Sequence, residues 1–187
     1  MADLFAELEQ VQTATDVRRY MAAMPSGLHL LAAPRDPFVM AQFGPDSYGQ
    51  LLALLSNFYD LLLLDLGTGL TGPLAQFALG RADQVVLVTT PEWVTSSIVV
   101  DALEHLRQRE YDRFTVAANK FYGRRPDELR RLEEVLRQRR LPRSVALPFD
   151  DQLAFMLDSG SYSLGALERP TRMAIKRLAL LVTELFV

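Results

Sequence analysis

The sequence of 187 residues contains no cysteine and only two histidines, His29 and His105, which stand far apart. The lack of cysteine excludes disulfides and thiolate metal sites. It also fits a reducing compartment, so we expect a cytoplasmic protein. Two isolated histidines do not provide the short spacing that a histidine metal site requires. We therefore expect no structural metal.

Long apolar runs and a strong excess of one charge are also missing. No apolar run approaches the ~20 residues that a membrane-spanning helix needs. The net charge of −3 disfavours a protein whose main role is to coat nucleic acid or a membrane, but it leaves room for a local basic patch. Hydrophobic residues make up 49% of the chain, which is enough to build a globular core.

Apolar runs and helical patterns alternate along the chain. Short apolar runs bounded by polar or turn residues predict strands, and the stretches between them carry apolar residues at helical spacing. We find no linker, no internal repeat and no signal for a tight β-hairpin, so residues 1–187 are expected to form one domain. The alternation predicts an α/β fold, a mostly parallel sheet of about five strands with helices on both faces. The expected strands are 28–34, 61–66, 84–91, 114–120 and 144–149.

Polar side chains are predicted at the ends of four of these strands. The segment DLLLLDLGTG at 60–69 reads as a strand buried on both faces that ends in a carboxylate and a Gly-x-Gly turn. Because parallel strands share a direction, their carboxyl ends meet at one edge of the sheet, where open α/β sheets bind nucleotides or phosphates. The residues at these ends are Asp65, Thr89, Thr90, Asn119, Lys120, Asp150 and Asp151.

The order of the motifs resembles the ParA/MinD group of P-loop ATPases. The motifs are YDLLLLDLGTGL, then ADQVVLVTTPEWVTSS, VAANK, LPFDD and SGS. The upstream segment PSGLHLLAAPRDP is similar to one found in the CpaE/TadZ-like pilus-assembly branch of that group. The resemblance covers nearly the whole chain from about Leu4. It implies a P-loop NTPase-like, Rossmann-like fold.

The resemblance implies roles for three residues around the turn that follows the leucines. Asp65 matches the catalytic Walker B carboxylate, which holds Mg²⁺ through its water shell when a nucleotide is bound. Gly67 and Gly69 match the switch that senses the γ-phosphate; without a Cβ atom their backbone N–H groups can approach an anion closely. The family usually has proline where Gly67 stands, so this part of the match is looser.

Three further residues match the part of the family site that holds the base. Asn119 matches the asparagine whose amide pairs with the adenine edge as both donor and acceptor. Pro148 and Asp150 match the loop that packs around the base. An asparagine at a strand end is also common as a turn or cap residue, and without the resemblance that interpretation of Asn119 is the favoured one.

The phosphate-binding loop of the family has no counterpart in this sequence. No G-x-x-x-x-G-K-[ST] pattern occurs, and neither Lys120 nor Lys176 follows a glycine. In family members this loop lies upstream, so we expect Met1 to begin partway into the family's domain. ATP and Mg²⁺ are the cofactors of the intact family. This chain alone is expected to hydrolyse no ATP and to bind ATP–Mg²⁺ weakly or not at all.

The resemblance implies a role in the spatial positioning or partitioning of cargo such as a plasmid, a chromosome or pilus machinery. The implied partners are a second copy of the chain, as a homo-dimer or oligomer, and a protein of such a system. One alternative is a catalytically dead scaffold of the same fold that acts by dimerising. Another is a receiver-like phosphoacceptor domain built from Asp65, Thr89 or Thr90, and Lys120. The receiver needs an acidic pair on its first strand, and LHLLAAP supplies none.

The Arg124–Arg143 segment is the most basic part of the chain, with eight arginines among four acids. Nonspecific DNA binding through these arginines is one interpretation. The acids are interleaved at i,i+3 and i,i+4 spacing, which favours instead a solvated helix with internal ion pairs.

Overall fold

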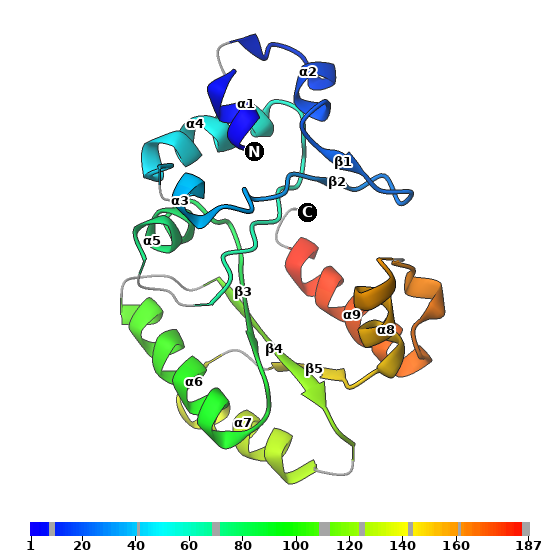
Figure 1. Ribbon diagram of the computed structural model, residues 1–187. Helices are drawn as coiled ribbons and strands as arrows, with labels where there is room; N and C mark the ends of the chain where they lie inside the picture. The colour runs from blue at the N-terminus through cyan, green and yellow to red at the C-terminus, as the bar shows by residue number, and fades with distance from the viewer. Residues whose placement is uncertain are drawn as a thin grey trace. The chain divides into compact units, whose positions relative to one another are not determined.

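The computed structural model describes residues 1–7, 10–40, 42–68, 72–108, 113–123, 126–141, 144–160 and 162–184. The chain divides into two compact units, Met1–Arg81 and Ala82–Val187 (Figure 1). Among the described residues, no helix has both the length and the apolar composition that crossing a bilayer requires.

The first unit is mainly helical and has its own core. Its helices are α1 (Ala2–Ala6), α2 (Ala14–Arg18), α3 (Pro37–Met40), α4 (Pro45–Ser56) and α5 (Pro73–Leu79). Helix α2 begins with a reciprocal capping box, in which the Thr13 hydroxyl accepts from the Asp16 N–H and the Asp16 carboxylate accepts from the Thr13 N–H. The buried core residues are Leu4, Val11, Val17, Leu51 and Leu55.

A short hairpin in the first unit contradicts the prediction that the chain has none. Strands β1 (Ala22–Ala23) and β2 (His29–Leu30) pair antiparallel. The turn between them closes with the Gly27 N–H donating to the Met24 carbonyl at 2.9 Å, and Gly27 adopts φ +87°. Pro25 suits the second position of such a turn. The Pro-Ser-Gly sequence was therefore a hairpin signal, and the strand predicted at 28–34 is limited to two residues.

The leucine run at 61–64 does not form the predicted strand. Residues 61–67 have no regular secondary structure, and Leu61, Leu63 and Leu64 are 49%, 74% and 46% exposed. Only Leu62 packs against the core of its unit. An apolar run becomes a strand when a neighbouring strand pairs with its N–H and C=O groups. The strands described in this unit pair only with each other.

The second unit contains the parallel sheet. Strands β3 (Val85–Thr89), β4 (Phe114–Phe121) and β5 (Ser144–Pro148) are parallel and lie in the order β3-β4-β5. The three strands predicted at 84–91, 114–120 and 144–149 are thus confirmed in position and direction. The expected count of about five is too high, because the two segments of the first unit do not join this sheet.

Helices cover both faces of this sheet, as predicted. Helix α6 (Trp93–Gln108) contacts β3 and α7 (Pro126–Gln138), while α9 (Arg169–Thr183) contacts β4 and β5. Figure 1 shows α6 and α7 on one side of the sheet and α9 on the other. Helix α8 (Asp151–Ser159) and the 3-10 helix η2 (Leu164–Ala166) connect β5 to α9. The architecture is an α/β fold.

Candidate functional site

A β-bulge lies at the carboxyl end of β4. The β4–β5 register shifts between Ala118 and Phe121, so that Asn119 and Lys120 interrupt the regular ladder. Lys120 has φ +56°, and its N–H donates to the Asn119 Oδ1 at 2.9 Å. A positive φ is uncommon outside glycine, and bulges are frequent next to binding sites because they redirect side chains. Asn119 therefore supports the bulge with its own side-chain oxygen.

An aromatic pair stands beside this bulge. The Phe149 N–H donates to the Phe121 carbonyl at 3.0 Å, which ties the segments after β4 and β5 together. The rings of Tyr122 and Phe149 stack with centroids 4.8 Å apart and planes 20° from parallel. Pro148, half-buried, is the last residue of β5. Sequence reasoning gave neither aromatic residue a role, although Phe149 ends the strand predicted at 144–149 and Tyr122 lies two residues after the strand predicted at 114–120.

Asp150 is buried and holds the start of two helices. Its Oδ1 accepts from the Gln152 N–H at 2.9 Å as the N-cap of α8, and its Oδ2 accepts from the Glu168 N–H at 3.0 Å, just before α9. Burial acts to raise the pKa of Asp150, but the nearby Thr171 hydroxyl and these N–H groups outweigh it and lower the pKa. Among the described residues, the Thr171 hydroxyl has no hydrogen-bond partner of good geometry. The two amide bonds are therefore the well-formed contacts of this carboxylate.

Asp65 and Gly67 form a local turn in the first unit. The Asp65 Oδ1 accepts from the Gly67 N–H at 2.9 Å, and Gly67 has φ +65°. This is an aspartate turn on exposed backbone, and Asp65 does not end a strand. Gly69 lies outside the described residues. The roles of these three residues stay predictions, and the receiver-like alternative lacks the strand end on which it would place Asp65.

The described residues contain no group of three or more histidines, aspartates or glutamates close enough to hold a metal ion. The structure instead brings Asn119, Pro148 and Asp150 to one edge of the sheet of the second unit. Thr89 ends the neighbouring strand of that sheet and is buried, with its hydroxyl donating to the Thr90 carbonyl at 3.1 Å.

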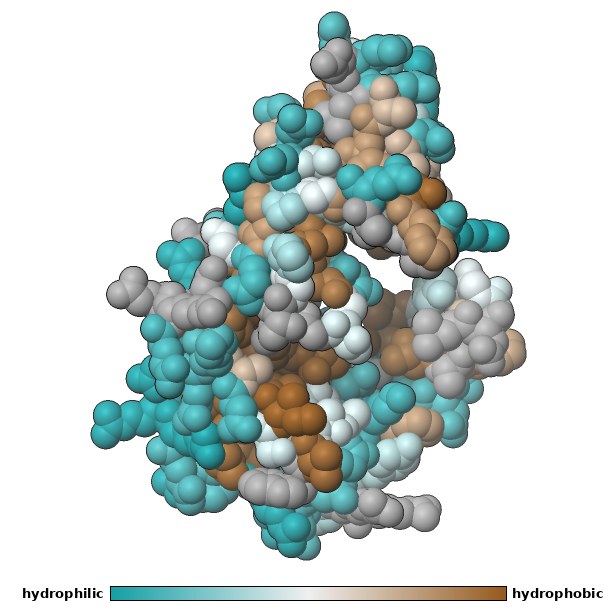
Figure 2. Space-filling model, turned by 60° about the vertical axis from the view of Figure 1, so that its left-hand side comes forward, coloured by the Kyte–Doolittle hydropathy of each residue, from teal (hydrophilic) through white to brown (hydrophobic). Residues whose placement is uncertain are grey.

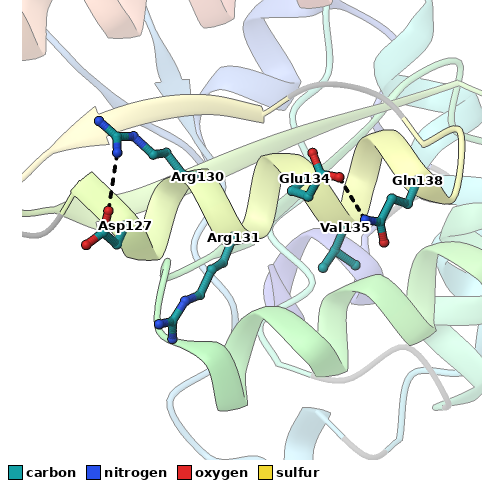
Figure 3. Close-up of a pocket in the computed structure, with 6 residues that line it drawn as sticks. All are labelled: Asp127, Arg130, Arg131, Glu134, Val135 and Gln138. Atoms are coloured by element: carbon teal, nitrogen blue, oxygen red, sulfur yellow. Dashed lines mark hydrogen bonds and ion pairs between the residues drawn. The ribbon is translucent and has the colours of Figure 1, made fainter.

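A shallow hollow of about 380 Å³ lies on the surface of α7, and none of the predicted site residues lines it (Figure 3). The side chains around it are mainly charged and partly paired with one another. Arg130 lies 3.4 Å from the Asp127 carboxylate, and the Glu134 carboxylate accepts from the Gln138 amide at 2.7 Å. The lining residues are Asp127, Arg130, Arg131, Glu134, Val135 and Gln138.

Arg137 of α7 and Arg139, which follows the end of this helix, are also engaged by acids. Arg137 forms an ion pair of 2.6 Å with Glu134, and Arg139 pairs with Glu104 and with Asp101 on α6. The i,i+3 pairs fit the interpretation of a solvated helix. The prediction of DNA binding through Arg124–Arg143 is not tested, and both end residues of that segment lie outside the described residues.

Comparison with protein-family models and with characterised proteins finds no match. Among solved structures, the chain is similar to the crystal structure of a ParA family ATPase from Chlorobium tepidum TLS. The TM-score is 0.81 at 19% sequence identity, over 96% of this chain and 75% of that one. At this level of identity the match shows a similarity of fold. The chain therefore has a ParA-type, P-loop NTPase-like α/β fold.

Proposed function

We propose that this chain is a ParA-like module of a system that positions or partitions cargo, such as a plasmid, a chromosome or pilus machinery. It acts through association with a second copy and with a protein partner, in the cytoplasm, and it does not hydrolyse ATP by itself. The observation that carries the proposal is a ParA-type fold in a sequence that contains no G-x-x-x-x-G-K-[ST] loop. The likeness of the 25–37 segment to the CpaE/TadZ-like branch makes pilus assembly the preferred setting.

The hydrogen-bond donors of the residues predicted to hold the phosphates do not suit the binding of a triphosphate with its Mg²⁺. A phosphate cradle needs several free backbone N–H groups and usually a lysine. Here the N–H of Gly67 is already bonded to Asp65, and the N–H of Lys120 is already bonded to Asn119. Both oxygens of Asp150 are likewise occupied by backbone amides. We therefore derive no catalytic step through ATP–Mg²⁺ for this chain.

The binding of ATP–Mg²⁺ to the purified chain tests this proposal. We expect at most weak binding by calorimetry and no release of phosphate above the rate of a Asp65→Ala variant. A low-micromolar dissociation constant, or turnover that the variant abolishes, would show that this chain holds the phosphates and would overturn the non-hydrolysing role.

The positioning role needs a separate test in the native host. A fluorescent fusion of this chain is expected to concentrate at defined places in the cell, and deletion of the gene is expected to displace its cargo. A fusion that stays evenly spread, together with an unchanged distribution of pili and DNA after deletion, would contradict the role.

A further inference from the structure

We infer that the exposed face of helix α9 is a docking surface for a negatively charged amphipathic helix of a partner protein. We call this surface the α9 face; it consists of Arg169, Met173, Lys176, Arg177 and Leu180. The inference deepens the proposed function, on which it rests only for the expectation that the chain acts with a protein partner. It names the surface that binds this partner and the chemistry that the partner needs.

Helix α9 has one side on the sheet and an exposed side opposite to it. The helix contacts β4 and β5, and Figure 1 shows it across the sheet from α6 and α7. Along its sheet-facing side, Thr171 is buried and Ile175 and Leu178 are half-buried. Helical spacing places Met173 and Leu180 on the opposite side, and they are 57% and 62% exposed. The α9 face is therefore accessible to a partner.

Met173 and Leu180 form a narrow apolar stripe on this face. They are seven residues apart in the helix, close to two full turns, so they lie nearly in line along its axis. Lys176 and Arg177 lie between them and on either side of the stripe, because they follow Met173 by three and four residues. Apolar side chains that recur every seven residues between flanking charges are the pattern by which one helix packs against another.

The cations of α9 determine the charge of the partner. The helix contains four cations and no acid, although the chain as a whole has a net charge of −3. Arg172 is used within the unit, where it donates to two backbone carbonyls at 3.3 and 3.4 Å. In the part of the chain that the structure describes, the side chains of Arg169, Lys176 and Arg177 have no ion pair or hydrogen bond. Charges that flank a helix seam select the opposite charge, so the partner carries aspartate or glutamate beside its apolar residues.

The narrow stripe favours a helix over the two other anionic surfaces that cations attract. Binding in a bilayer surface needs a wide apolar face. Here the exposed apolar side chains are Met173, Leu180 and, at the margin, Leu181, which is 36% exposed. Duplex DNA attracts cations through its phosphates, which offer nothing to an apolar stripe. An amphipathic helix with acids beside its apolar row matches both the stripe and the charges of the α9 face.

Two synthetic peptides that differ only in charge test the inference. Each has about three heptads with leucine at positions a and d. One has glutamate at positions e and g and the other has lysine there, so that like charges oppose the pairing of each peptide with itself. Binding to the full chain is measured by NMR titration in about 0.1 M salt. We expect the glutamate peptide to bind at least about tenfold more tightly than the lysine peptide and to shift the amide signals of α9.

Substitutions on the α9 face separate the apolar from the charged contribution. Leu180→Ala should weaken the binding of the glutamate peptide by at least about fivefold, because it removes one of the two apolar side chains of the stripe. Lys176→Glu combined with Arg177→Glu should reverse the preference, so that the lysine peptide binds more tightly than the glutamate peptide. Arg130→Glu changes an exposed arginine of α7 and is the matched control, which should leave both affinities unchanged.

Three results with the peptides would overturn the inference. They are a glutamate peptide that does not bind at about 1 mM, equal binding of the two peptides, and a double variant that still prefers glutamate. A DNA duplex of random sequence and vesicles of anionic phospholipid are the remaining probes. If either binds more tightly than the glutamate peptide and loses its binding in the double variant, the α9 face belongs to that ligand and the partner helix is excluded. These measurements use neither a nucleotide nor a cell, so their failure leaves the tests of ATP binding and of positioning unaffected.

Discussion

At the scale of single residues, Asp150 is the side chain with the clearest structural task. It caps α8 through one oxygen and receives the Glu168 N–H with the other. Replacement by alanine removes the cap and leaves the partly buried N–H groups of Gln152 and Glu168 without their acceptor, so Asp150→Ala should lower the free energy of unfolding by about 2–3 kcal/mol. Asp150→Asn keeps one accepting oxygen and should cost less. Urea denaturation measures both, and equal losses for the two variants would contradict this account.

The difference in stability between the unmodified chain and Asp150→Asn should depend on pH, in a way that follows from the direction of the pKa shift of Asp150. The pKa of Asp150 is lowered below its ordinary value of 3.8 in the folded protein. The ionised carboxylate therefore contributes its full stabilisation above 3.8, and this contribution is lost as the pH falls through the lowered pKa. The gap in stability between the unmodified chain and Asp150→Asn should narrow in that acidic range. A gap that stays constant across it would exclude the carboxylate charge as the cause.

Arg140 has a backbone conformation from which the effect of a substitution can be predicted. It follows α7 with φ +56°, and the Leu141 N–H bonds back to the Leu136 carbonyl at 2.8 Å, the pattern of a helix end that usually employs glycine. Arg140→Gly should therefore raise the free energy of unfolding by about 0.5–1 kcal/mol. The reverse change at the end of α8, Gly160→Ala, places a side chain at φ +65° and should destabilise by a similar amount. Shifts of the same sign in the two variants would rule out backbone conformation as the explanation.

At the scale of elements, the leucine run separates the structure from the sequence-based prediction. Leu63 is 74% exposed, so Leu63→Ala should change the free energy of unfolding by no more than about 0.5 kcal/mol. Leu62 packs against the core of its unit, and Leu62→Ala should cost about 1–2 kcal/mol. In a strand buried on both faces, both changes would cost about 2–5 kcal/mol. Thermal or urea unfolding of the two variants distinguishes these cases.

The contrast between this run and the strands of the second unit explains which elements the sequence predicts. Each strand of the second unit has a parallel neighbour in the same unit, so an apolar pattern is enough to predict it. These strands contain the segments QVVLVT, FTVAAN and SVALPF. The leucine run has the same local pattern, but a ladder partner is a property of the fold and leaves no mark in the segment itself. The same limit applies to Tyr122 and Phe149, whose stacking depends on the register of two strands.

At the scale of the whole molecule, the alternation of elements was enough to predict the α/β class, and the order of motifs was enough to predict the ParA-type fold. The site was predicted less well. Asn119 and Asp150 were identified as residues of one sheet edge, because strand direction alone brings such ends together, whereas Pro148 was identified only through the family resemblance. Their hydrogen bonds were not predictable, since the donors come from Lys120, Gln152 and Glu168 through the bulge and the helix starts.

Self-association is the prediction that involves the whole molecule. In the sheet order β3-β4-β5, β3 has one edge without a partner among the described strands. Parallel pairing alternates along a strand: the Val85 N–H donates to the Arg113 carbonyl toward β4, so the backbone groups of Val86 and Val88 face the open edge. Val88 is 60% exposed. An exposed apolar strand edge is a template for pairing with another chain.

Exposed apolar side chains on α6, the helix that contacts β3, add to the tendency to associate. Val94 and Ile98, one turn apart on α6, are 72% and 64% exposed, and Figure 2 shows apolar surface between polar regions on the face it presents. Contiguous exposed apolar surface favours burial against a partner. We therefore expect the purified chain to form a dimer or a higher oligomer at tens of micromolar, with a mass by light scattering of at least twice 21.1 kDa.

A charge at the open edge tests whether β3 carries this contact. Lysine is the residue that natural edge strands use against pairing, so Val88→Lys combined with Val94→Lys should shift the chain toward the monomer. Met173→Lys, a similar change on the 57% exposed Met173 of α9, serves as the control and should leave the mass unchanged. A mass of 21.1 kDa for the unmodified chain would contradict self-association altogether. An oligomer that persists in the double variant would instead place the contact away from β3, because a lysine ammonium cannot be buried in a paired strand edge without a large cost in desolvation.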